Sequence, residues 1–299
     1  MTEERKFSRG GVNTCSSCDL SPSENKTQRQ TDTEYVAYIS YGKDSLAMLE
    51  AIKILNYPLD RVIHTEVWAT DDIHADFPEM VDFKSKADEI IKARYGIEVE
   101  HICAMKNGEK LTYEKQFYTK RIVKRLQEER IYGFPIVLGA WCNSKLKVSP
   151  MNRLEREMKN KKTVQYLGIA CDEPERIARH SINKCKVMPL VDIEWNEAYC
   201  RKWCEENNLL SPTYENADRG GCWFCHNQSV DQLRFLRKTY PNLWKLLLKW
   251  DKDSPVTFKA DKHTVADYEK RFQAEDDGKI VAGDKKFRWK QVLEDIESK

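Results

Sequence analysis

The sequence lacks the features that would place it in a membrane or outside the cell. Its 299 residues contain no apolar run of about 18 residues, the length needed to span a bilayer. The first residues, MTEERKFSRGG, contain no apolar stretch typical of a secretory signal. We therefore expect a cytoplasmic protein that does not contact membranes.

The chain also lacks an excess of charge of either sign. Fifty Lys and Arg residues stand against 48 Asp and Glu residues, which gives a formal net charge of +2. This balance excludes a global electrostatic attraction to nucleic acid, membranes or acidic partners, although a local basic groove stays open. Hydrophobic residues make up 40% of the chain, enough for one large domain with or without a smaller appendage.

Cysteine is absent from the last part of the chain, because none follows Cys225, yet the whole chain holds ten. Without an export signal these thiols are expected to stay reduced, which favours metal, iron–sulfur or redox chemistry for some of them. Four of them form two Cys-x-x-Cys pairs, Cys15/Cys18 and Cys222/Cys225.

Alternating strand and helix patterns predict the fold. Residues 1–33 are polar and aperiodic, so we expect a loose arm unless Cys15 and Cys18 bind a metal. From residue 34 to 187 the pattern predicts an α/β domain: a Rossmann-like doubly wound, mainly parallel sheet with helices on both faces. Residues 188–299 are expected to form a Cys-x-x-Cys turn and a small, mostly helical C-terminal region. The expected strands are 35–39, 61–68, 98–104, 135–139 and 164–169, and the expected helices are 46–55, 79–95, 113–129, 151–159, 195–207, 230–251 with a new segment at Pro241, 264–274 and 289–296.

The segment between the first strand and the first helix indicates a phosphate site. A turn that contains glycine and leads into a helix presents free backbone N–H groups, and the helix dipole favours negative charge there. Lys43 adds a cation and two serines add hydroxyl donors. An ordinary polar turn is the alternative reading. The predicted phosphate-binding residues are Ser40, Tyr41, Gly42, Lys43, Asp44 and Ser45.

This Ser-Tyr-Gly-Lys-Asp-Ser segment resembles the Ser-Gly-Gly-Lys-Asp-Ser loop of the PP-loop ATP pyrophosphatases, of the adenine nucleotide alpha hydrolase-like superfamily. Within it the chain is most similar to the phosphoadenosine phosphosulfate (PAPS) reductase family, from which Tyr41 departs because Gly is usual there. Three further stretches carry the resemblance in order, over roughly residues 34–230: residues 141–151, residues 168–176, and the stretch from Met188-Pro189-Leu190 through Tyr214 to Gly221-Cys222. The resemblance implies binding of ATP or a related adenine nucleotide.

Charged residues in these stretches suit the same ligand. Lys145 and Lys147 would face an anionic substrate, and Gly168 and Arg176 lie in a loop where nucleotide contacts are expected. Asp172 and Glu173 are candidates to hold Mg²⁺ on the phosphates, with catalytic roles beside Lys43 and Asp44. The alternative is a surface ion-pair network. A further acidic group follows the second strand, at Asp71, Asp72 and Asp76, and His64 and His74 are expected to be polar or packed residues rather than ligands.

The resemblance also nominates Cys142, Cys222 and Cys225 as ligands of a 4Fe–4S cluster, as in the adenylylsulfate reductases of the family. Asn143 stands at the family's second cysteine, so only three ligands match. Either another residue completes the set, or one iron stays open and holds a sulfide. In the alternative, Cys15/Cys18 and Cys222/Cys225 bind Zn²⁺. The candidates for the fourth ligand are His226, Cys171, Cys185 and Cys15/Cys18.

Three functions follow from these observations. The first is adenylation of an acceptor with release of pyrophosphate, with sulfur transfer as a further step. The second is a sulfonucleotide reductase acting on PAPS or adenylylsulfate, although the family's C-terminal nucleophilic cysteine is missing. The expected partners are the nucleotide, an unidentified acceptor that includes nucleic acid among its candidates, and a sulfur or electron donor protein; a homo-oligomer is left open. The third is a nucleotide-dependent nucleic-acid-binding module without turnover, suggested by Trp223, Phe224, Trp244, Trp250, Arg234, Arg237, Lys238, Lys245 and Lys249.

Overall fold

A five-stranded sheet forms the centre of the computed structural model, which describes residues 28–123, 127–135, 140–158, 161–216 and 220–293. The strand order is β3-β2-β1-β8-β9 and every pairing is parallel. The strands are β1 (Thr33–Ile39), β2 (Arg61–Glu66), β3 (Val99–Cys103), β8 (Lys162–Tyr166) and β9 (Lys186–Val187). Cys15, Cys18 and most of the expected strand 135–139 lie outside the described residues.

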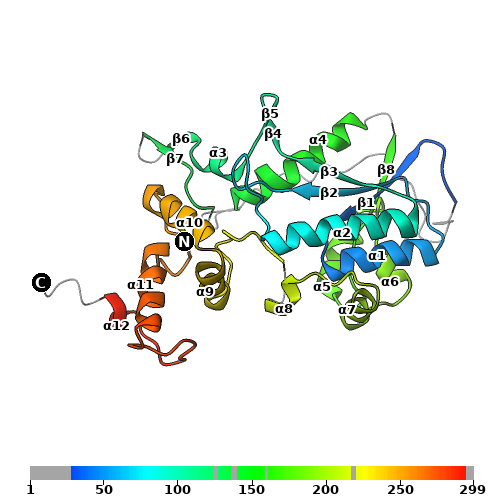
Figure 1. The fold of residues 1–299 in the computed structure, drawn as a ribbon. Helices are drawn as coiled ribbons and strands as arrows, with labels where there is room; N and C mark the ends of the chain where they lie inside the picture. The colour runs from blue at the N-terminus through cyan, green and yellow to red at the C-terminus, as the bar shows by residue number, and fades with distance from the viewer. Residues whose placement is uncertain (1–27, 124–126, 136–139, 159–160, 217–219, 294–299) are drawn as a thin grey trace, which may run out of the picture.

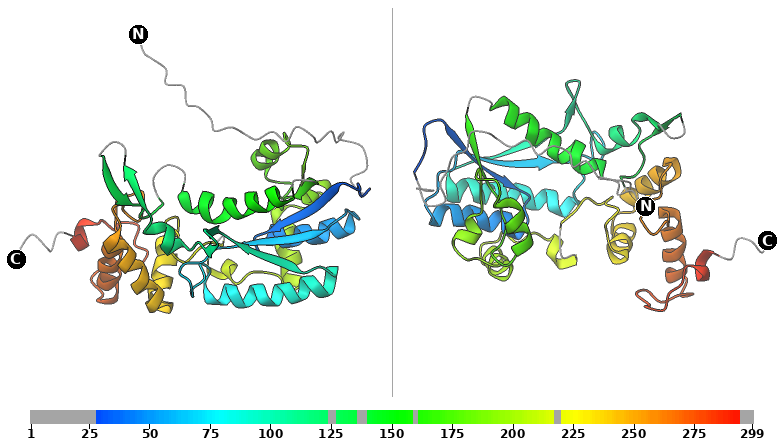
Figure 2. Two further views of the ribbon diagram at one scale, coloured as in Figure 1. Left: turned by 90° about the horizontal axis from the view of Figure 1, so that it is seen from above. Right: turned by 180° about the vertical axis from the view of Figure 1, so that it is seen from behind.

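The central strand β1 has an almost continuous apolar run because both of its faces are covered. Val36 and Ala37 are fully buried on opposite faces. Helices α1 (Lys43–Ile54) and α2 (Pro78–Tyr95) cover one face, and α4 (Ser149–Glu157) covers the other (Figures 1 and 2). The expected α/β fold with a parallel sheet and helices on both faces is confirmed.

Helices α5 (Pro174–His180), α6 (Pro189–Asp192) and α7 (Glu197–Glu206) follow β8 and lie beside α1 (Figure 1). Leu190, Cys200 and Cys204 join the same hydrophobic core as the sheet and α1. This core therefore extends past residue 188, where we expected the C-terminal region to begin.

A second hydrophobic core is formed by the C-terminal helices, which lie at the far end of the molecule from β8 (Figures 1 and 2). It packs Trp223 and Trp250 against Phe117 and Leu146, which come from the α/β part of the chain. Pro241 begins a new helix, as expected. The helices that contribute to this core are α9 (Val230–Thr239), α10 (Pro241–Asp253) and α11 (Val265–Asp276). Two short helices, α8 (Thr213–Asn216) and α12 (Lys290–Leu293), complete this part of the chain.

The expected helix 113–129 is wrong. Only α3 (Tyr113–Phe117) is helical, and an antiparallel hairpin of β6 (Lys120–Val123) and β7 (Glu128–Ile131) follows it. The β-branched pair Ile122-Val123 favours a strand, and the cross-strand ion pair between Lys120 and Glu129 (2.9 Å) stabilises the hairpin. A second short hairpin, β4 (Met105–Lys106) with β5 (Glu109–Lys110), was also not expected.

The expected helix 151–159 begins earlier than the sequence indicated. A π-helical turn, η1 (Asn143–Val148), precedes α4, so Lys145 and Lys147 lie inside a helix rather than before one. Pro150 lacks a backbone N–H, which interrupts the regular hydrogen-bond ladder at this point.

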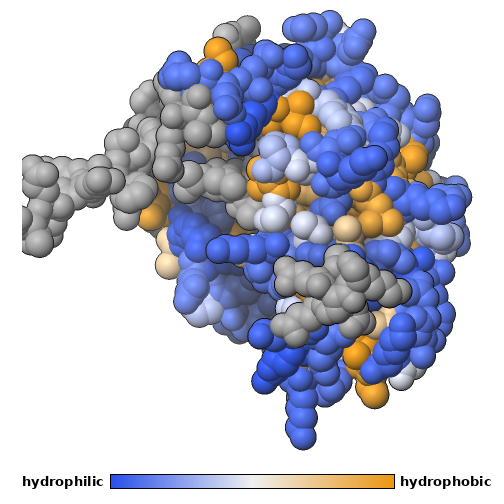
Figure 3. All heavy atoms as spheres, turned by 90° about the vertical axis from the view of Figure 1, so that its left-hand side faces the viewer, coloured by the Kyte–Doolittle hydropathy of each residue, from blue (hydrophilic) through white to orange (hydrophobic). Residues whose placement is uncertain are grey.

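Hydrophilic side chains cover most of the described surface on the side shown in Figure 3, and the apolar areas between them are small and separate. Among the described residues, no helix combines the length and apolar character needed to cross a bilayer.

Candidate active site

A cavity of about 480 Å³ lies at the carboxyl ends of β1 and β2. This is the edge of a parallel sheet at which ligands bind in doubly wound folds. The cavity brings together residues that are far apart in the sequence. The predicted nucleotide- and metal-binding residues that line it are Ser40, Tyr41, Gly42, Asp44, Ser45, Lys147, Gly168, Arg176 and Cys222.

The loop between β1 and α1 is held by its own hydrogen bonds. Ser45 Oγ accepts from the backbone N–H of Ser40 (3.2 Å) and donates to the carbonyl of Gly42 (2.9 Å). Gly42 is the N-cap of α1 and makes no side-chain capping hydrogen bond. The loop therefore has a fixed shape at the N-terminus of this 12-residue helix, where backbone N–H groups and the helix dipole favour an anion, and the first of these N–H groups, that of Lys43, donates to the Tyr214 hydroxyl.

Tyr41 does not crowd the loop. Its backbone has φ +56°, a conformation that favours glycine, and its ring is completely buried. The phenol donates to Asp88 of α2 and lies 3.2 Å from Nε2 of His101 on β3. Burial and the Asp88 hydrogen bond raise the pKa of Tyr41 well above its usual range, so the phenol keeps its proton. Tyr41 thus adopts a backbone conformation usual for glycine, and its buried side chain is an anchor that attaches the loop to α2 and β3.

His101 completes this anchor. Its two ring nitrogens donate to Asp88 (2.9 Å) and to Glu66 (2.9 Å). These hydrogen bonds raise the pKa of His101 to about 9 and lower that of Glu66 to about 2, so the imidazolium and its carboxylates are charged at neutral pH.

Gly168, which follows β8, touches the start of α1. A Cβ at this position would meet the Cα of Ser45 at 2.8 Å and the carbonyl oxygen of Asp44 at 2.9 Å. Both are backbone atoms, which cannot rotate away. The absence of a side chain at Gly168 therefore lets the segment after β8 approach the loop closely.

The Lys43 ammonium is not among the groups lining the cavity. It is held between Asp44 (3.0 Å) and Glu197 of α7 (2.9 Å). The backbone N–H of Lys43 donates to the Tyr214 hydroxyl (3.2 Å). The side chain that we expected on the phosphates is thus paired with two carboxylates.

Asp172 and Glu173 also do not line the cavity. Asp172 accepts from the backbone N–H of Glu197 (3.1 Å), and Glu173 accepts from that of Ala170 (3.1 Å). Glu173 is ion-paired with Arg176, which does reach the cavity. The carboxylates that line the cavity are instead Asp44 and Asp76, and Lys145 is exposed on η1.

A buried lysine that was not among the predicted site residues lines the cavity, with its ammonium 5.4 Å from the ring of Tyr41 in the loop. Lys84 of α2 is only 8% exposed, and its ammonium contacts Nε2 of His64 (2.8 Å) and a carboxylate oxygen of Asp76. Nδ1 of His64 lies 3.0 Å from the carbonyl of Ile39, which can only accept, so Nδ1 carries the proton and Nε2 accepts from Lys84. Burial and the neighbouring Lys84 lower the pKa of His64 to about 4, so the imidazole is neutral.

The sequence pattern around Lys84 nevertheless indicates that this lysine is buried. The buried face of α2 consists of Met80, Lys84, Ala87 and Ile91, so the lysine occupies an apolar position of an amphipathic helix. His64, expected to be a packed or polar residue, is buried in the strand β2 as well as being part of the cavity wall.

The Cys-x-x-Cys turn forms another part of the wall. Trp223 fixes it to the loop after β2, because its backbone N–H donates to Ala75 (2.8 Å) and its indole N–H to His74 (2.9 Å). The N–H of Cys225 closes the turn on the carbonyl of Cys222 (3.0 Å). Neither Gly220 nor Gly221 has a positive φ, and no atom of the described residues would lie within 4 Å of a Cβ at either position, so the turn does not require glycine there.

Cys142, Cys222 and Cys225 lie close enough to the buried Tyr113 to affect its pKa. Burial and these three thiols raise the pKa of Tyr113 well above its usual range, and among the described residues its hydroxyl has no hydrogen-bond partner. Lys147 and Cys222 both line the cavity, and the Cys222 thiol and Asp76 raise the pKa of Lys147. Burial raises the pKa of Cys222 to about 12.

Three soft donors near an unpartnered buried hydroxyl suit a metal–sulfur group. As they stand, however, the described residues include no set of three or more His, Cys, Asp or Glu side chains positioned to hold a metal ion. Of the candidate fourth ligands, Cys185 is disulfide-bonded, and Cys171 and His226 join no such set.

The four aromatic residues and two of the basic residues that suggested a nucleic-acid surface on the C-terminal helices make contacts within the protein, whereas Lys238 and Lys245 are exposed. Trp223, Phe224, Trp244 and Trp250 are at most 4% exposed. Arg234 and Arg237 are ion-paired with carboxylates of α11, among them Glu275 and Glu269. These aromatic rings belong to the second core.

No family model matches the sequence, and no curated protein matches it either. Among solved structures, the U34-tRNA thiolase NcsA from Methanococcus maripaludis, determined with its [4Fe-4S] cluster, is similar to this chain. The similarity covers 82% of this chain and 84% of that protein, with 13% sequence identity and a TM-score of 0.38. The functional assignment below therefore rests on the residues of the site itself.

Proposed function

We propose that this protein is a PP-loop enzyme that binds ATP or a related adenine nucleotide, adenylates an acceptor oxygen and releases pyrophosphate. The observation that carries the proposal is the cavity, in which one wall is the fixed loop Ser40–Ser45 and another contains Lys147 and Cys222. A phosphate site and a thiol thus face one space. That combination suits activation of an acceptor followed by sulfur transfer.

In this proposal the α1 N–H groups bind the phosphates, and Lys147 and Arg176 stabilise the charge that develops on pyrophosphate as it leaves. Asp44 is the carboxylate of the loop that would hold Mg²⁺ on the phosphates, since Asp172 and Glu173 are engaged elsewhere. Bound phosphates would compete with Glu197 for the Lys43 ammonium, which would then contact the phosphates.

We propose Cys142, Cys222 and Cys225 as the ligands of a 4Fe–4S cluster, with Zn²⁺ as the alternative metal. When bound, the cluster would hold or supply sulfur. The protein's own part is to surround it with Tyr113 and Lys147, which exclude water and place a cation beside it.

The nucleotide part is tested by equilibrium dialysis with Mg·ATP and by product analysis. Substituting both cavity cations, Lys147→Ala with Arg176→Ala, should weaken ATP binding at least about tenfold because two charge-assisted contacts are lost. Lys202→Ala, an exposed residue of α7, is the matched control. Cleavage of ATP to ADP and phosphate, or sulfite release from PAPS, would contradict the proposal.

The metal part is tested by anaerobic purification with iron, acid-labile sulfide and zinc quantified. Cys142→Ala should lower the metal content, whereas Cys103→Ala on β3 should not. Iron with sulfide supports the cluster and zinc alone supports the alternative. Full metal content in Cys142→Ala would show that the ligand set is wrong.

A further inference from the structure

The near-neutral charge of the chain conceals a strongly basic segment. Residues 105–161, from the first residue of β4 to the residue before β8, contain 14 Lys and Arg residues and 6 Asp and Glu residues, a net charge of +8. Since the whole chain has 50 and 48, the remainder has 36 and 42, a net charge of −6. Positive charge is therefore concentrated in about one fifth of the chain.

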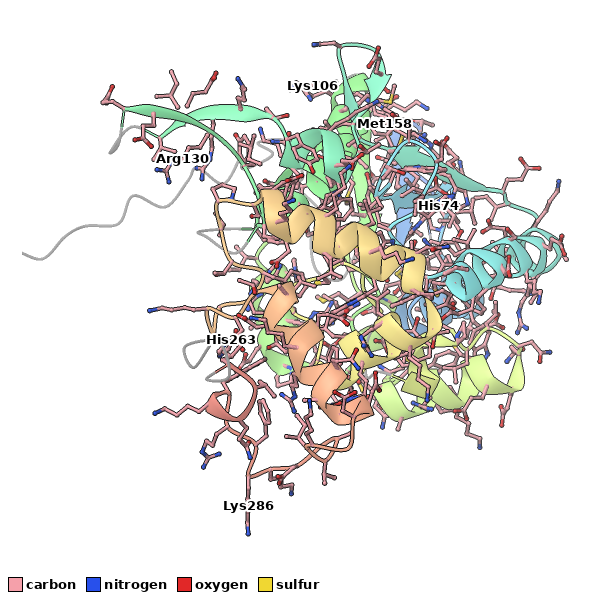
Figure 4. All side chains as sticks on the ribbon, turned by 60° about the vertical axis from the view of Figure 1, so that its left-hand side comes forward. His74, Lys106, Arg130, Met158, His263 and Lys286 are labelled. Atoms are coloured by element: carbon pink, nitrogen blue, oxygen red, sulfur yellow. The ribbon has the colours of Figure 1, made fainter. Side chains whose placement is uncertain are left out.

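The elements of this segment lie along one side of the molecule. The β4–β5 hairpin, α3, the β6–β7 hairpin and α4 occupy the upper side in Figure 1, and α5 to α7 lie on the opposite side. Figure 2 (left) views this upper side directly. Figure 4 shows Lys106 on the first hairpin and Arg130 on the second, both along this edge. We call this side, from Lys106 to Arg156, the basic edge.

Several cations of the basic edge are not paired with a carboxylate of the described residues. Four of them have exposed side chains: Lys106, Arg121, Lys145 and Arg156. On α9, Arg234 and Arg237 are both ion-paired with α11. The C-terminal helices also carry exposed lysines, so what distinguishes the basic edge is its net charge of +8 together with its extension to the cavity.

A half-buried aromatic ring lies beside one of these cations. The Arg121 guanidinium is 5.2 Å from the Tyr132 ring. Trp68 is a second half-buried ring near this edge, but Lys110 at 3.3 Å and His74 at 3.7 Å already cover its two faces. A ring beside a cation suits a base stacked next to a phosphate. An acidic protein would need the cations but not the ring, so the Arg121–Tyr132 pair favours nucleic acid.

The basic edge also reaches the cavity. Lys147 of η1 and Met151 of α4 line it, and Lys145 and Arg156 belong to the same two helical segments. We propose that the basic edge binds a single-stranded segment of a polynucleotide and that a group on this strand is the acceptor. The second part rests on the proposed function, because it names the acceptor class of that reaction.

A pair of matched triple variants tests this proposal. The edge variant carries Lys106→Glu, Arg121→Glu and Arg156→Glu, and the control carries Lys238→Glu, Lys245→Glu and Lys270→Glu on the C-terminal helices. Both change the net charge equally, and thermal unfolding checks that both are folded. Fluorescence anisotropy with labelled RNA and DNA strands of about 30 nucleotides measures affinity over about 50 to 200 mM salt.

We expect the edge variant to bind at least about tenfold more weakly and to lose about two units from the slope of log K against log salt, while the control binds as wild type does. A preference for RNA or for DNA identifies the kind of strand, and either supports the proposal. Wild-type affinity in the edge variant, a loss confined to the control, or displacement of the strand by polyglutamate as readily as by unlabelled strand would overturn it.

Pyrophosphate release separates the two proposals. Protein that releases pyrophosphate with a small acceptor but binds no strand would refute the inference and leave the proposed function standing. Protein that binds strands through the basic edge but releases no pyrophosphate would leave the binding surface standing and refute the reaction.

Discussion

The two walls of the cavity are held in place by different means. On the loop wall, hydrogen bonds of Ser45, the close approach of Gly168 and the buried anchor of Tyr41 fix every part of the backbone. On the cysteine wall, Trp223 fixes the turn, but the nearby Tyr113 hydroxyl has no hydrogen-bond partner in the described part of the chain. The loop wall is thus held by several hydrogen bonds and close contacts, whereas the cysteine wall is held mainly by Trp223 and leaves a buried polar group unsatisfied.

The largest expected effect comes from a methyl group placed on the loop wall. Gly168→Ala would bring a Cβ to 2.8 Å from the Cα of Ser45, so the start of α1 must shift. We expect pyrophosphate release to fall about 100-fold and the free energy of unfolding to fall by about 3 kcal/mol. Steady-state kinetics and urea denaturation measure the two effects.

Gly220→Ala on the cysteine wall is the matched control. No atom lies within 4 Å of a Cβ built there, and its φ is not positive. This variant should keep wild-type stability and activity. Equal losses in both glycine variants would show that the walls do not differ as described.

The second prediction concerns the anchor of the cysteine wall. Trp223→Leu removes a fully buried indole and its hydrogen bond to His74, which should lower the free energy of unfolding by about 2–3 kcal/mol and release the turn. Metal content should fall with it while ATP binding, which uses the loop wall, persists. Trp244→Leu, a similarly buried change on α10, serves as the control: it should lower stability but not metal content. Unchanged metal content in Trp223→Leu would show that metal binding does not depend on the position of the turn.

The third prediction concerns the anchor of the loop wall. Tyr41→Phe keeps the ring but removes one of the two hydrogen bonds that Asp88 accepts, the other being from His101, which should lower the free energy of unfolding by about 1–2 kcal/mol. The ATP KM should rise with little change in metal content. Tyr95→Phe, which removes a hydroxyl bonded to Glu50 at the other end of α2, should lower stability without raising the KM. An unchanged KM in Tyr41→Phe would mean that the anchor does not position the loop.

The loop wall could be predicted from the sequence because most of its residues are close together in the chain. Strand, turn and helix follow one another within residues 33–54, and the parallel sheet then brings Gly168 to the same edge. The alternation of apolar runs was enough to predict the sheet and most of its helices. It failed at residues 113–129, where β-branched residues and cross-strand charges outweighed the helical spacing.

Other parts of the site depend on tertiary contacts that spacing cannot predict. The pairing of Lys43 with Glu197 joins residues 154 positions apart, and Glu197 is not one of the residues that carry the resemblance to the family. The displacement of Asp172 and Glu173 from the cavity likewise depends on α7, to which Asp172 bonds. Lys84 could have been found, because a lysine on the apolar stripe of α2 conflicts with the pattern around it.

The smallest expected effect concerns the stability contributed by His101, which hydrogen-bonds to Glu66 and Asp88. The pKa of His101 is raised from 6.5 to about 9, so its contribution to stability is fully present below pH 6.5 and is lost as the pH rises through 9. For its partner Glu66, lowered to about 2, the contribution is lost only as the pH falls from about 4.5 towards 2. His101→Gln should therefore cost about 1–2 kcal/mol near pH 6, allowing for solvent screening, and almost nothing near pH 10. Urea denaturation of both proteins across this range measures the difference. His180→Gln on α5 is the control: burial lowers the pKa of His180, so its effect on stability should change only on the acid side of pH 6.5. A difference for His101→Gln that persists at pH 10 would show that the imidazolium charge does not stabilise the anchor of the loop wall.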